Sequence, residues 1–117
     1  MLDDVATCIR GLPKRLKIGP YDWKIVIFDG EHELCGQAVF AEDQVKLWPE
    51  MLTSPSHAVG IVLHECLHVI FENQKLSLIK GSKDQREEAI VDGFETGLIS
   101  LLRDNPKLFN WMRKWLK

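Results

Sequence analysis

The sequence predicts an α+β fold in a single domain that spans residues 1–117. The chain length of 117 residues is that of one typical domain. The hydrophobic pattern changes once, near residue 50, from short strand-like segments to helical periodicity. Strands followed by helices are typical of the α+β class. The apolar fraction of 45% and the charged fraction of 27% are those of globular proteins, and they exclude a disordered chain.

Three segments before residue 50 are rich in aromatic and β-branched residues, and we predict strands over residues 21–28, 36–40 and 45–48. The polar residues 41–44 between the last two segments are suited to a hairpin turn. We therefore expect a small antiparallel or mixed sheet of about three strands. A short helix over residues 2–12 precedes it, because Gly11 and Pro13 end helical structure there.

Three helices are predicted after residue 50, over residues 55–73, residues 82–104 and residues 106–117. Ser54 caps the first helix, and Pro55 occupies its first position, where proline loses no hydrogen bond. Ser82 and Gln85 have capping-box spacing at the start of the second helix.

The motif His64-Glu65-Cys66-Leu67-His68 lies within the first long helix, among apolar neighbours. His64 and His68 are four residues apart and share one helix face, so both imidazoles can bind one Zn²⁺. Glu65 lies beside the metal rather than on it. There it can accept a proton from a zinc-bound water and act as general base.

A hydrolytic zinc site needs a third protein ligand, and the second long helix is the natural donor. Glu88 and Asp92 share one face of that helix, so Glu88 can bind the metal while Asp92 accepts the free N–H of a ligating histidine. The apolar stripe of the helix centres on Glu87 instead, so periodicity alone favours Glu87 as the inward ligand. Glu88 is preferred because only Glu88 has an acidic partner four residues later.

The segment VLHECLH, nineteen further residues and the segment EAIVDGFETGL together resemble the thermolysin-type gluzincin metallopeptidases, whose pattern is HExxH followed by ExxxD. The resemblance covers about residues 60–102. It implies a zincin-like fold, one Zn²⁺ per chain held by His64, His68 and Glu88, Glu65 as catalytic base and Asp92 as the partner of a ligating histidine. It therefore implies a zinc metallopeptidase that hydrolyses a polypeptide substrate.

The chain is too short for the second lobe that completes the cleft in large gluzincins. It is similar in layout to small, single-domain zincin-like proteins of phages and prophages, and a protein partner or a second copy of the chain could complete the cleft. The large members supply His and Tyr to the oxyanion from that lobe, whereas Tyr21 lies outside any matching motif. In zincins an edge strand pairs with extended substrate, and residues 36–40 and 45–48 are the candidates for that role.

Other polar residues have simpler interpretations. We expect His57 to be a first-turn residue without a catalytic role, and His32 has no assigned role. Cys66 points roughly 160° away from His68 around the helix, which predicts a buried thiol and not a fourth ligand. The three cysteines lack CxxC spacing and are expected to be reduced.

The partner and location follow from charge and hydropathy. A formal charge of −2 does not favour a nucleic-acid partner, and no apolar stretch is long enough to span a membrane. The N-terminal segment does not resemble a secretory signal, so we expect a cytoplasmic protein. The C-terminal stretch PKLFNWMRKWLK either packs its Trp residues onto the domain or docks a partner. The alternative function is therefore a non-catalytic, zinc-stabilised binding module that engages a protein or nucleic acid through this helix.

Overall fold

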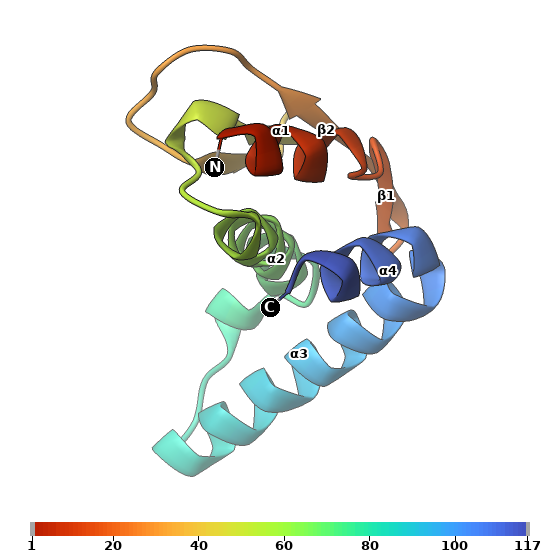
Figure 1. Ribbon diagram of the computed structural model, residues 1–117. Helices are drawn as coiled ribbons and strands as arrows, with labels where there is room; N and C mark the ends of the chain where they lie inside the picture. The colour runs from red at the N-terminus through yellow and green to blue at the C-terminus, as the bar shows by residue number, and fades with distance from the viewer. Residues whose placement is uncertain (1, 117) are drawn as a thin grey trace.

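The computed structural model describes residues 2–116, so Met1 and Lys117 of the predicted domain lie outside the described residues. The chain has the α+β architecture that the sequence predicts, with the sheet in the first half and the long helices in the second (Figure 1). In chain order the elements are α1 (Leu2–Arg10), β1 (Arg15–Ile18), β2 (Tyr21–Ile27), β3 (Gly36–Val39), β4 (Gln44–Leu47), the 3₁₀ turn η1 (Pro49–Met51), α2 (Pro55–Asn73), the 3₁₀ turn η2 (Leu76–Leu78), α3 (Lys83–Asp104) and α4 (Pro106–Trp115).

The four strands form one mixed sheet in the order β1-β2-β4-β3. β1 and β2 form an antiparallel hairpin that turns at Gly19, where φ is 61°, a conformation that glycine adopts without strain. β3 and β4 form the predicted antiparallel hairpin, and β4 lies parallel to β2. β3 is therefore the edge strand of the two candidates, because β4 is paired on both sides.

The prediction of about three strands is wrong by one, because the sequence pattern did not reveal β1. Its segment RLKI has only four residues, no aromatic residue and two basic residues. The apolar pair Leu16 and Ile18 nevertheless points into the core, and the alternating Arg15 and Lys17 point to solvent. Pairing with β2 and burial on one face override its weak local preference for strand.

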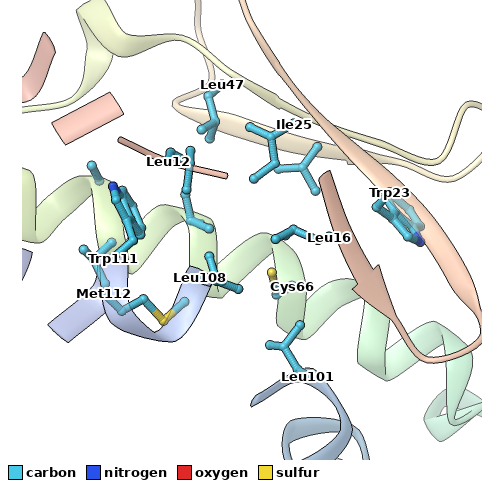
Figure 2. Packing of buried hydrophobic residues seen from close by; sticks show 14 of the residues in the cluster. Leu12, Leu16, Trp23, Ile25, Leu47, Cys66, Leu101, Leu108, Trp111 and Met112 are labelled. Carbon is cyan, nitrogen blue, oxygen red and sulfur yellow. The ribbon is translucent and has the colours of Figure 1, made fainter. Parts of the chain in front are cut away.

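One face of the sheet forms the core together with the helices. The strands contribute six buried apolar side chains to it: Leu16, Ile18, Trp23, Ile25, Val45 and Leu47. Figure 2 shows Leu16 of β1, Cys66 of α2 and Leu101 of α3 meeting in this core. Along β1, β2 and β4 the residues that alternate with the buried ones are exposed or half-buried, so the opposite sheet face is turned to solvent, and α2 is held against the inner face.

The two long helices begin where the sequence predicts. Ser54 Oγ accepts a hydrogen bond from His57 N–H at 3.1 Å, and Pro55 occupies the first position of α2. Ser82 and Gln85 form both bonds of the capping box at the start of α3. Because both starts are fixed by local chemistry, their positions could be predicted without knowing the tertiary fold.

α3 packs on α2 through two glycines. Gly97 lies directly against Ile70 of α2, and Gly93 lies against Gln74 and Leu76 just beyond the end of α2. The absence of a side chain at these positions allows the close approach. In Figure 1, where α2 is seen nearly end-on, the first turns of α3 extend away from α2 and from the sheet.

We expect Gly97→Ala to destabilise the protein by about 1–3 kcal/mol, because the new methyl group would overlap Ile70. Gly60→Ala is the matched control: Gly60 is exposed within α2, and its new methyl group would meet no atom within 4 Å apart from its chain neighbours and the backbone of α2 itself. This variant should therefore gain up to ~1 kcal/mol. Urea unfolding of the two variants measures both values. Equal stability of the two variants would contradict this close helix contact.

α4 packs its apolar side into the core, the first of the two alternatives for the C-terminal stretch. Leu108, Trp111 and Met112 are buried, and Trp111 Nε1–H donates a 2.7 Å hydrogen bond to the carbonyl of Cys8 in α1. Phe109 remains exposed beside the basic residues of the helix. Among residues 2–116, no helix has the length and hydropathy needed to span a membrane.

Candidate functional site

The HExxH segment occupies the middle of α2, where one helix side is buried and the other faces solvent. The buried side of α2 consists of Ala58, Val59, Val62, Glu65, Cys66, Val69 and Ile70. His64 and His68 lie on the exposed side, next to Glu65. The helix thus presents two imidazoles to solvent and holds the intervening carboxylate against the protein.

The two imidazoles converge. Their Nε2 atoms lie 3.1 Å apart, with the ring planes at 80° to one another. Two nitrogen donors bound to one tetrahedral ion at ~2.0–2.1 Å would be about 3.3 Å apart. In the structure one Nε2 donates a hydrogen bond to the other, and the same separation suits a shared cation. The donor type and the spacing of this pair therefore fit Zn²⁺.

Glu65 connects α2 to the edge strand β3. Its side chain is 6% exposed, and Oε1 accepts a 3.1 Å hydrogen bond from the backbone N–H of Ala38. Its other oxygen, Oε2, lies 4.0 Å from His64 Nε2. One carboxylate oxygen is thereby fixed by the sheet while the other faces the histidine pair. Sequence reasoning missed the contact with Ala38, because a backbone donor leaves no signal in the side-chain pattern.

Cys66 is fully buried, as predicted, and lies in the core between Leu16 and Leu101 (Figure 2). Burial, and then the negative charge of the neighbouring Glu65, raise the pKa of its thiol to about 12. Burial likewise raises the pKa of Cys8 to about 11. Both side chains are therefore neutral thiols at physiological pH, which suits packing and not metal binding.

Glu88 and Asp92 are exposed on the first turns of α3, together with Glu87. The nearby Gly93 lies against Gln74 and Leu76, which follow α2, and not against the turn of α2 that carries the histidines. Within residues 2–116, no three His, Cys, Asp or Glu side chains lie together as a complete metal-binding group. The structure thus brings His64, Glu65 and His68 together, and it does not place Glu88, Glu87 or Asp92 beside them.

The other two histidines have local structural contacts. His57 Nδ1 accepts a 3.1 Å hydrogen bond from Thr53 N–H at the start of α2, as befits a first-turn residue. His32 stacks on Trp48 with ring centroids 3.8 Å apart, and its Nδ1 accepts a hydrogen bond from Leu34 N–H. These contacts give His57 and His32 structural roles in the fold.

Comparisons with known proteins give no relative for this chain: no family model, no curated protein and no solved structure matches it.

Proposed function

We propose that the protein is a zinc-dependent metallopeptidase in which His64, His68 and Glu88 hold one Zn²⁺ and Glu65 is the general base. The observation that carries this proposal is the convergence of the two Nε2 atoms, 3.1 Å apart, beside a buried carboxylate. Metal-assisted hydrolysis requires metal ligands and a general base next to them, and the two histidines and Glu65 are suited to these roles. The zincin-like fold remains part of the proposal.

Glu65 moves the proton in the proposed reaction. Bound Zn²⁺ would polarise the substrate carbonyl and increase the acidity of water at the site. Glu65 Oε2 takes a proton from the attacking water, whose oxygen bonds to the carbonyl carbon. The C–N bond then breaks, and the proton passes from Glu65 to the leaving nitrogen. The hydrogen bond from Ala38 N–H to Oε1 keeps the carboxylate oriented through both transfers.

The edge strand β3 is suited to hold the substrate in this scheme. It is paired only with β4, and Ala38 on β3 is already bonded to Glu65. An extended peptide that pairs with the free edge of β3 would lie beside the catalytic carboxylate. The substrate is accordingly a polypeptide in extended conformation.

Glu88 has to come closer to His68 than it does in the structure to serve as the third ligand. The segment before Gly93 makes few contacts with the rest of the chain, since all its residues from Lys83 to Glu88 are exposed. Such a segment can change position at low cost in buried area. We propose that zinc binding draws it toward the histidine pair.

Chelation tests the proposal. The purified protein should cleave peptides from a mixed library, lose this activity on treatment with 1,10-phenanthroline and recover it when zinc is added back. Mass spectrometry of the library identifies the products. Cleavage that persists in chelator, or no cleavage by the zinc-loaded protein, would contradict a metallopeptidase.

A further inference from the structure

A cavity of about 340 Å³ lies one helical turn beyond the histidine pair. It is bounded by the last turn of α2, the start of β2, and the β3–β4 hairpin, and its walls include Tyr21, Trp23, Phe40, Asp43, Glu72 and Lys75. Glu72 follows His68 by four residues, so it lies on the same helix side and ~6 Å farther along the axis. Phe40 follows Ala38 by two residues, ~7 Å along the chain. We call this space the Trp23 cavity.

The indole N–H of Trp23 lacks a partner. The side chain is 2% exposed, and its Nε1 is the one buried side-chain nitrogen or oxygen without a hydrogen bond within the described chain. Trp111 shows the usual situation, since its Nε1–H bonds to the carbonyl of Cys8. Figure 2 shows the Trp23 nitrogen on the side of the ring that points away from the other core residues. A buried donor of this kind needs an acceptor, and the adjacent cavity is where a ligand can supply one.

The charges around the cavity favour a cation. Asp43 and Glu72 line it from the hairpin turn and from α2, and in residues 2–116 neither carboxylate forms an ion pair. Glu72 lies in the last turn of α2, at the negative end of the helix dipole, and that turn contains no basic residue. Lys75 also lines the cavity, yet it is not paired with either acid among these residues. The exposed rings of Tyr21 and Phe40 add two surfaces that attract cations.

A bare metal ion does not suit these groups, because the two carboxylates have no third His, Cys, Asp or Glu beside them in the described chain. A simple amine would satisfy the carboxylates but would leave the indole N–H unmet. A peptide residue with a cationic side chain meets both requirements. It has a positive charge, and its amide carbonyl can accept a hydrogen bond from Trp23 Nε1–H. The guanidinium of arginine also stacks well on aromatic rings.

We propose that the Trp23 cavity binds an arginine or lysine side chain of a peptide. Its role as a specificity pocket rests on the proposed function, because the cavity then lies next to the scissile bond. The preferred substrates are peptides with a basic residue close to the site of cleavage. Asp43 and Glu72 bind the cation, and Trp23 donates its N–H to the adjacent main-chain carbonyl.

The test measures peptide binding to the Glu65→Gln protein, in which hydrolysis does not interfere. Two probes are compared by calorimetry: acetyl-Ala-Ala-Arg-Ala-Ala-amide, and the same peptide with neutral citrulline in place of arginine. The arginine peptide should bind at least ~10-fold tighter, because its guanidinium is a cation that the carboxylates of Asp43 and Glu72 can bind, whereas citrulline is neutral. Glu72→Gln and Asp43→Asn, each added to Glu65→Gln, should each reduce this preference several-fold, and Trp23→Phe should weaken both peptides equally.

Glu50→Gln is the control, because Glu50 is exposed in η1, outside the cavity lining, and its removal should keep the preference. Equal affinity for the two peptides, no binding of either, or a preference that survives both Asp43→Asn and Glu72→Gln would overturn the proposal. Failure of the metallopeptidase function looks different: the arginine preference would remain while the zinc-loaded wild-type protein cleaves no peptide. Cleavage without any preference for basic residues would refute the Trp23 cavity as a specificity pocket and would leave the metallopeptidase function standing.

Discussion

Glu65→Gln is expected to reduce peptide hydrolysis by about 10²–10⁴-fold, because the amide cannot accept the proton of the attacking water. The fold should survive the change. The glutamine carbonyl oxygen can accept the same hydrogen bond from Ala38 N–H that Glu65 Oε1 accepts now. Zinc content should also stay the same, since Glu65 lies beside the ligands and not among them. Steady-state kinetics and elemental analysis of one preparation measure both quantities.

Glu50→Gln is the matched control for this experiment. Glu50 is an exposed glutamate outside the site, so its replacement should leave kcat/KM unchanged. A Glu65→Gln protein that retains full activity would remove Glu65 from the role of base. Loss of zinc in this variant would instead make Glu65 a ligand.

The second large effect is expected at the third ligand. Glu88→Ala should weaken zinc binding by more than ~100-fold. Loss of a residue that only hydrogen-bonds to a metal ligand already weakens metal binding by about 10–100-fold, and loss of a ligand itself costs more. Asp92→Ala should weaken it by about 10–100-fold, since Asp92 is proposed to orient a ligating histidine. Competition with a fluorescent zinc chelator gives the dissociation constants.

Glu87→Ala distinguishes the two assignments that the sequence leaves open. Glu87 and Glu88 are adjacent and both exposed, so the two alanine variants change the same charge and the same helix turn. We expect Glu87→Ala to bind zinc like the wild type. Weakened zinc binding in Glu87→Ala alone would identify Glu87 as the third ligand, which is the assignment that the apolar periodicity of α3 favours. Wild-type affinity in both variants would exclude this turn of α3 from the metal site.

Local chemistry explains which parts of the fold were predictable. The β3–β4 hairpin, the cap at Ser54 and the capping box at Ser82 are each specified within a few residues, and the structure confirms all three, with the hairpin turn at residues 40–43 instead of the predicted 41–44. β1 was missed because its pairing with β2 and its burial are tertiary effects. The packing of α3 was missed for a related reason: a pattern of apolar residues cannot show that Gly93 and Gly97 make the contact.

The candidate site likewise has one part that local sequence predicts and another part that depends on tertiary packing. Helix geometry alone predicts that His64 and His68 meet, since four residues complete about one turn, and their Nε2 atoms do meet. The distance between Glu88 and this pair depends on how far α3 is shifted along α2, which no local pattern specifies. The contact of Glu65 with Ala38 and the unmet N–H of Trp23 likewise depend on the packing of β3 and β2 against α2.

Zinc content tests the central claim most directly. Elemental mass spectrometry of the purified, untagged chain should find about one zinc per chain, and His64→Ala should contain none, because one of the two converging donors is lost. His32→Ala, which removes a histidine that stacks on Trp48 instead, should keep the metal. A wild-type chain without metal, even after zinc is supplied, would contradict the account and leave the HExxH segment as part of an ordinary helix.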